Sequence, residues 1–142
     1  MAIARATINT DIWDTIRGYL NDSSVTNIAK LVSAYAKSFT KDASSKDFVV
    51  LHSPGITETR LTFTKISYPF TMQVEVVVSE EEQMKVLNAA IRARVAASLN
   101  NARGDGIFNL RISGDTTSYE TREDVRILHN IITLEGIYRG ET

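Results

Sequence analysis

The longest strand signal in the chain lies close to its end. Between Val125 and Tyr138, apolar residues occupy both alternating sets of positions: Ile127, Ile131 and Ile137 in one set, and Leu128, Ile132, Leu134 and Tyr138 in the other. Successive side chains of a β-strand point to opposite faces, so both faces of this strand would be apolar at its centre. We therefore expect it to lie inside a sheet covered on both sides, or to bury its second face against another subunit.

A long amphipathic helix is expected over residues 79–101. Its apolar residues form one stripe at helical spacing: Met84, Leu87, Ile91, Val95 and Leu99. Ser79 and Glu82 have the spacing of a capping box, which predicts that the Ser79 side chain caps the helix. Residues 104–106, Gly-Asp-Gly, are typical of the turn that ends a helix, and they precede a strand rather than a helix. They therefore predict no phosphate-binding loop.

Shorter signals fill the rest of the chain. Apolar residues at helical spacing predict two helices within residues 9–39, separated by the polar residues 21–24. Apolar or alternating runs predict strands over 48–51, 61–64, 70–78 and 107–112.

The strands over 61–64 and 70–78 are expected to form an antiparallel pair that turns near residues 67–69, and residues 113–118 are expected to form a polar loop. The sequence thus predicts a single α+β domain over residues 1–142. It has one mainly antiparallel sheet packed by the long helix, with N-terminal helices and the order ααβββαββ.

Composition excludes several classes of function. The 142 residues carry 16 Lys and Arg against 17 Asp and Glu, a formal charge of -1, which gives no overall attraction to nucleic acid or to an anionic membrane. Cysteine is absent, and with it disulfides, thiolate nucleophiles and Cys-containing metal sites. No signal peptide and no 18-residue apolar run is recognisable, so we expect a soluble protein synthesised in the cytosol.

The two histidines, His52 and His129, offer little for catalysis. They could bind a metal together with a carboxylate such as Glu135, but they lack short ligand spacing, so we expect them to be packed or solvated separately. The sequence predicts no catalytic, cofactor-binding or metal-binding residues, no cofactor and no enzymatic activity.

Charge is unevenly distributed in the second half of the chain. Basic residues occur over 85–111 and acidic residues over 115–124; the interface candidates are Lys85, Arg92, Arg103, Arg111, Asp115, Glu120, Glu123 and Asp124. These residues form either a solvated surface or a complementary contact between two subunits, which would set register more than stability.

The order of elements resembles the tail terminator (tail completion) proteins of long-tailed bacteriophages. The resemblance covers about residues 48–139. It rests on a hairpin that runs into Val-Val-Val-Ser-Glu-Glu-Glu at 76–82, one long helix, a strand, a charged loop, and a terminal strand that ends Ile-Ile-Thr-Leu-Glu-Gly-Ile-Tyr-Arg at 131–139.

The resemblance implies a structural subunit of the virion tail or neck, made in the host cytoplasm, that forms a homohexameric ring. The ring would cap the tail tube and join it to the head-proximal connector or stopper protein. DNA would pass through without sequence-specific binding, and no membrane would be involved. Gln73 and Glu75 are candidates for the lumen, or for the ordinary wet face of a strand.

Three other functions stay open at this stage. One is a different neck or head-tail connector subunit. Another is a ligand-binding regulatory α+β domain with a pocket between the long helix and the sheet. The third is an enzyme whose site is not recognisable in the sequence.

Overall fold

The computed structural model describes residues 3–33, 47–122 and 124–141. It confirms an α+β fold in which a mixed, mostly antiparallel sheet packs against one long helix. After a 3-10 turn at Arg5–Thr7, the elements are α1 (Ile8–Leu20), α2 (Ser23–Thr26), β1 (Ala29–Ser33), β2 (Asp47–Leu51), β3 (Gly55–Ile56), β4 (Thr59–Arg60), β5 (Lys65–Val78), α3 (Glu81–Ala97), α4 (Leu99–Gly104), β6 (Ile107–Arg122) and β7 (Val125–Glu141).

All seven described strands belong to one sheet, with the order β1-β2-β5-β7-β6. β1 and β2 are parallel, and every other pair is antiparallel. The first half of β5 pairs with β4 and β3, whereas its second half pairs with β2. β7 lies between β5 and β6, which confirms that the terminal strand is an interior one.

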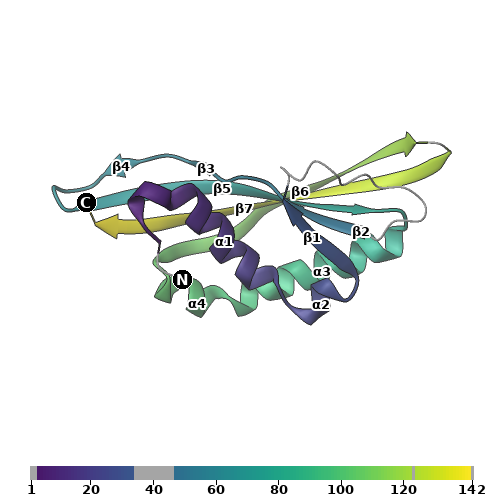
Figure 1. The fold of residues 1–142 in the computed structure, drawn as a ribbon, viewed down its shortest axis with the longest axis horizontal. Helices are drawn as coiled ribbons and strands as arrows, with labels where there is room; N and C mark the ends of the chain where they lie inside the picture. Colours follow the sequence, from purple (N-terminus) through teal and green to yellow (C-terminus); the bar gives the residue numbers. More distant parts are fainter. Residues whose placement is uncertain (1–2, 34–46, 123, 142) are drawn as a thin grey trace.

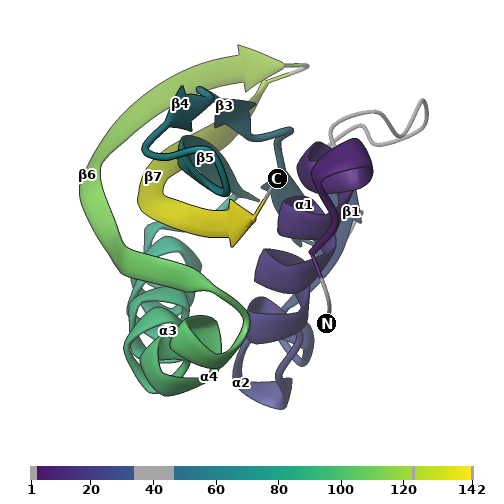
Figure 2. The same ribbon diagram turned by 90° about the vertical axis from the view of Figure 1, so that its left-hand side faces the viewer.

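The helices lie on one side of the long strands, and the β6–β7 hairpin runs past the ends of the other strands (Figure 1). Seen along the strands, the sheet is strongly curved, with β6 bent around its outer edge (Figure 2). The main core lies between the helices and the sheet. Fully buried side chains there include Ile12 and Ile16 of α1, Leu87 and Ile91 of α3, and Met72 and Ile132 of the sheet.

The opposite face of the sheet carries a second, smaller apolar cluster. Its buried members are Phe48, Val50, Val77 and Ile127, with Val32 and Val125 packed against it. Further along β7, Ile131 and Ile137 on this outer face are only half-buried. The last strand is therefore buried on its outer face only near its start, around Ile127.

The second predicted N-terminal helix is wrong over residues 29–33, which form β1; its remainder, residues 34–39, lies outside the described residues. The short helix α2 ends at Thr26. β1 runs parallel to β2 and places Leu31 opposite Val49 and Val32 opposite Val50. A short run of apolar residues fits the period of a helix and that of a strand equally well, so pairing with the buried strand β2 decides the structure here.

The predicted strand over 61–64 and the predicted turn near residues 67–69 are also wrong, because β5 begins at Lys65 and continues through Pro69. The chain reverses instead at residues 61–64, where the Thr62 hydroxyl accepts hydrogen bonds from the backbone N–H groups of Thr64 and Lys65. Pro69 lies between the stretches of β5 that pair with β3 and with β4. Its missing N–H therefore interrupts no ladder on that side.

The long helix is shorter than predicted and begins differently. α3 ends at Ala97, and a separate α4 follows after the buried Ser98. The N-cap residue of α3 is Glu80, whose side chain makes no capping hydrogen bond, so Ser79 does not cap this helix. The expected turn after the helix is confirmed: α4 ends at Gly104, and Gly106 adopts φ +89° beside the Tyr138 ring, where a side chain would not fit.

Candidate functional site

The candidate site is the free edge of the sheet, formed by β6. Residues 113–118, expected as a loop, belong to this strand. Two register shifts interrupt its pairing with β7, between Phe108 and Arg111 and between Ile112 and Gly114. From Gly114 to Arg122 the pairing is regular, and we call this stretch the edge segment. Residues 113–119 are all exposed, so a long strand edge faces solvent.

A polar network holds the edge segment on the helix side of the sheet. Its centre is Asn130 of β7, which is only 2% exposed. Asn130 Oδ1 accepts a hydrogen bond of 2.8 Å from Asn88 Nδ2 of α3. Asn130 Nδ2 donates to the carbonyl of Thr116 at 3.3 Å and to the Thr117 hydroxyl at 3.2 Å. Because these partners satisfy the buried amide, a polar stretch of sequence is stable here as a strand.

An ion pair extends this network at the surface. Arg92 of α3 donates to the Asp115 carboxylate and also to Asn88 Oδ1, the latter at 2.9 Å. The hydrogen bond from Arg92, followed by the one from Asn88, lowers the pKa of the Asp115 carboxyl, although partial burial opposes the shift. One basic and one acidic interface candidate therefore pair within a single chain.

We expect Asp115→Asn to destabilise the protein at neutral pH and to lose its effect in acid. A lowered pKa means that ionised Asp115 stabilises the folded state above the ordinary carboxyl range, and that this contribution is lost as the pH falls below about 4. Urea unfolding at pH 7, 4 and 3 measures the difference from wild type. In an Arg92→Gln background the same substitution should cost less at pH 7; an equal cost would show that the pair is uncoupled.

A second polar cluster lies on the outer side of the sheet, away from the helices. The His52 Nε2 of the loop after β2 is 3.0 Å from Glu75 Oε1 of β5. The other Glu75 oxygen is 2.7 Å from His129 Nδ1 of β7, and His129 Nε2 is 3.2 Å from Glu120 Oε1 of β6. The expectation that the two histidines are separate is wrong, because Glu75 joins them.

Metal binding by this cluster finds no support in the geometry. Glu135, the carboxylate considered as a ligand, is instead 2.8 Å from Arg111 in an ion pair between β6 and β7. Within residues 3–33, 47–122 and 124–141, no group of three or more His, Asp or Glu side chains has an arrangement that could hold a metal ion.

The remaining candidates are dispersed. Lys85 is exposed and 3.8 Å from Glu81, one helical turn earlier. Arg103 lies in α4, at the end of the molecule away from the β6–β7 tip (Figure 1). Asp124 is exposed at that tip with φ 64°. Glu123 lies outside the described residues.

The two lumen candidates differ from each other. Both belong to β5 and share its outer face, since they are two residues apart in a strand. Gln73 is exposed there, whereas the Glu75 side chain is only 18% exposed and accepts hydrogen bonds from two histidines. Of the two, only Gln73 is exposed.

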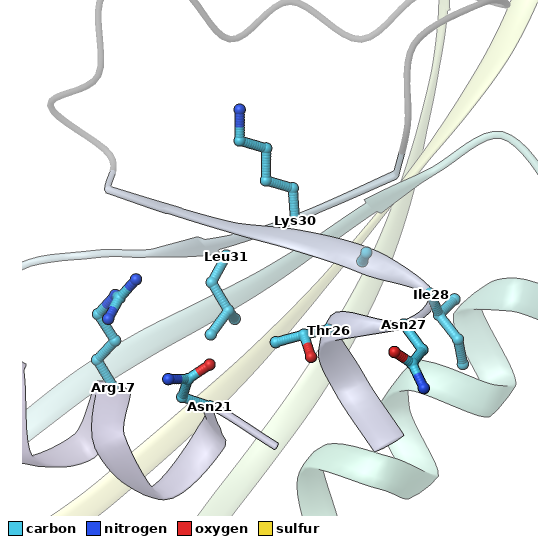
Figure 3. Close-up of a pocket in the computed structure, with 8 residues that line it drawn as sticks. Arg17, Asn21, Thr26, Asn27, Ile28, Lys30 and Leu31 are labelled. Atoms are coloured by element: carbon cyan, nitrogen blue, oxygen red, sulfur yellow. The ribbon is translucent and has the colours of Figure 1, made fainter. Parts of the chain in front are cut away.

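A hollow of about 640 Å³ lies at the opposite edge of the sheet, beside β1. Its lining comes from the end of α1, the turn after α2 and β1: Arg17, Asn21, Thr26, Asn27, Ile28, Ala29, Lys30 and Leu31. Leu31 points toward Asn21 and Thr26, whereas Lys30 points to the other side of the strand (Figure 3). This hollow is not between the long helix and the sheet, where the sequence would have placed a ligand pocket.

Comparison with known proteins identifies no family for this chain. No protein-family model matches the chain, and no curated protein matches it. None of the helices in the described residues is long and apolar enough to cross a membrane.

Sequence reasoning missed two residues of the site, Asn88 and Asn130, and it missed that His129 contacts both Glu75 and Glu120. Asn130 gave one usable signal, a polar residue at a position of β7 whose neighbours on the same face, Leu128 and Ile132, are apolar. A buried amide of this kind needs partners, which points to polar residues on the packed helix. The histidine contacts gave no such signal, because they depend on the pairing of three strands.

Proposed function

We propose that this chain is a structural subunit of a phage tail, a tail terminator that assembles into a homohexameric ring. The ring caps the tail tube and contacts the head-proximal connector or stopper protein, and DNA passes through it without being read. The protein acts by docking against copies of itself and against these partners, and it catalyses no reaction.

The exposed edge of β6 is the observation that carries this proposal. The strand has 16 residues and pairs only with β7 among the described strands. Soluble proteins usually protect such an edge with proline, bulges, charges or short length. The edge segment has no proline and no register shift over Gly114–Arg122; its charged residues are Glu120, Arg122 and Asp115, the last of which pairs with Arg92. An edge this long and regular is a template for contact with another chain.

The two edges of the sheet favour a head-to-tail contact. One edge is β6, whose only described neighbour is antiparallel, and the other is β1, whose neighbour is parallel. A contact that joins two different surfaces is heterologous, and it closes into a ring when the rotation between subunits permits. The within-chain pairings of Arg92 with Asp115 and of His129 with Glu120 leave Asp124 and Arg103 as the charges to test at such a contact.

Two measurements test this proposal, each made on the protein alone and on the protein mixed with tail tubes. Native mass spectrometry gives the mass of the assembly, and negative-stain microscopy shows its shape. We expect ring particles of six chains, either free or on the tube end. Thr116→Lys, which adds a charge to the exposed edge segment, should weaken assembly at least about tenfold. Asn100→Lys, the same charge on the exposed face of α4, should not. A monomer under all conditions would overturn the proposal.

The hollow beside β1 favours one second candidate, a ligand-binding domain. Its volume of about 640 Å³ is within the usual range for small-molecule sites, and Arg17 in its lining would suit an anionic ligand. This function predicts a monomer or dimer whose melting temperature rises with added ligand. A different neck subunit would instead form rings that bind the connector and not the tube.

A further inference from the structure

A smaller hollow, of about 220 Å³, lies between α1, the end of β1 and the loop after β2. Its described lining residues are Asn9, Thr10, Trp13, Asp14, Ser33 and Ser53. The first four share one side of α1, because residues three and four apart are neighbours on a helix. An aromatic ring, a carboxylate and several hydroxyl or amide groups thus meet in a space below the usual size of a drug-sized site, which suits one side chain or a small ligand.

Hydrogen bonds between α1 and the end of β2 hold the walls of this hollow in place. The Trp13 indole Nε1 donates to the carbonyl of Leu51 at 3.3 Å. The Asn9 side chain donates from Nδ2 to the carbonyl of Pro54 at 2.8 Å, and its Oδ1 accepts from the Ser53 hydroxyl at 3.0 Å. Because the indole N–H is already used, the Trp13 ring has its π face left to offer a ligand.

Asp14 is the charged residue of this lining, and it is half-buried. Among the described residues, no Lys, Arg or His lies within ion-pair distance of its carboxylate, and no group donates a hydrogen bond to it. Arg17, one turn later in α1, lines the hollow beside β1 instead. A partly buried carboxylate without a partner has lost hydration with nothing in exchange, and a cation in the hollow would compensate it.

The lining favours a guanidinium group over other cations. A guanidinium is planar and stacks on an aromatic face, as the Trp13 ring would allow. It presents several N–H donors to one carboxylate, and it is more weakly hydrated than an ammonium, so it enters a partly buried site at a lower cost. The Ser53 hydroxyl, whose hydrogen is directed at Asn9, can accept one further hydrogen bond through its oxygen.

We propose that this hollow binds a guanidinium group, stacked on Trp13 and hydrogen-bonded to Asp14. The same chemistry recognises a small free guanidine compound and an arginine side chain of a bound peptide. The site lies beside β1, whereas the edge segment belongs to β6 at the other end of the strand order. It requires neither a ring nor a second copy of the chain, so it goes beyond the proposed function and does not depend on it.

Trp13 is the single tryptophan of the chain, so its indole N–H peak in proton–nitrogen-15 spectra reports directly on the hollow. At constant salt, we expect N-acetyl-arginine methylamide or agmatine to shift this peak in a saturable way. Tighter binding of the first would identify a peptide side chain as the source of the group, and tighter binding of the second a free ligand. Methylurea, which has the shape of methylguanidinium without its charge, should bind at least about tenfold more weakly than methylguanidinium. No saturable shift with either arginine-type probe, or equal binding of methylurea, would overturn the proposal.

Asp14→Asn removes the charge of the site and keeps the shape of the side chain. Because no described partner of Asp14 is lost, the melting temperature should not fall, whereas the affinity for the tighter arginine-type probe should decrease at least about tenfold. Asp124→Asn, the same substitution at the exposed tip of the β6–β7 hairpin, is the matched control and should leave the affinity unchanged. Equal affinities of wild type and Asp14→Asn would contradict the proposal. Since these measurements use unassembled protein, failure of ring formation leaves them unaffected, and absence of guanidinium binding leaves the proposed function unaffected.

Discussion

Ile91→Ala is expected to lower the free energy of unfolding by about 2 to 5 kcal/mol. The Ile91 side chain is fully buried in the middle of α3, within the main core between that helix and the sheet. Truncation removes buried methyl groups and leaves a cavity that rigid strands cannot collapse around. Leu87→Ala, one turn earlier and equally buried, should cost a similar amount. Urea or guanidinium unfolding, fitted with a common slope, measures both losses.

A change on the exposed side of the same helix serves as the control. Val86 is 45% exposed, so Val86→Ala should alter stability by no more than about 0.5 kcal/mol. The three variants share a helix and differ in the face they present. If Ile91→Ala and Val86→Ala had equal effects, α3 would not pack on the sheet through its Leu87–Ile91 face.

The core-facing side of α3 could be predicted because the spacing of apolar residues along a helix alone determines which of them share a face. Of the five residues predicted to form the apolar stripe, Leu87, Ile91 and Val95 are buried and Met84 packs against the core. The fifth, Leu99, is exposed, because it lies in the separate helix α4. The interior position of β7 was similarly accessible, since apolar residues on both faces require neighbours. Each of these inferences needs only local sequence.

The two strands that were mispredicted depend on distant partners. β1 forms because β2, at least 14 residues later in the chain, offers Val49 and Val50 for parallel pairing. The polar residues of β6 form a strand because Asn130 and α3 supply their hydrogen bonds. Neither partner can be read from the segment itself. Residues 29–33 have apolar residues that also fit helical spacing, and the polar residues 113–118 locally favour a loop.

The charged residues of the site were recognised, but their partners were not. Arg92 and Asp115 were expected either on a solvated surface or on opposite sides of a contact between subunits, and they meet within one chain because α3 packs beside β6. His129 meets Glu75 and Glu120 because strand pairing places β5 and β6 on either side of β7. The charged residues can be identified from the sequence, whereas their partners depend on the register of β5, β6 and β7.

Gly136→Ala is expected to lower the free energy of unfolding by about 1 to 3 kcal/mol, through overpacking rather than backbone strain. Gly136 is buried in β7 opposite Phe70 of β5. A Cβ at this position would lie 2.8 Å from Phe70 Cζ, 3.0 Å from Phe70 Cε1 and 3.3 Å from Ile107 Cγ2. The Phe70 ring occupies the space that a side chain would need, and it is itself held in the core.

Gly114→Ala is the matched control, since no atom lies within 4 Å of the added Cβ at that exposed position of β6. It should change stability by no more than about 0.5 kcal/mol. Phe70→Leu provides the complementary test, because a smaller side chain opens space beside Gly136. If the clash with the ring causes the loss, Gly136→Ala in the Phe70→Leu background should cost measurably less than in wild type. Additive losses in this double-mutant cycle would show that the ring is not the obstacle, and that Ile107 or the backbone of β7 opposes the substitution.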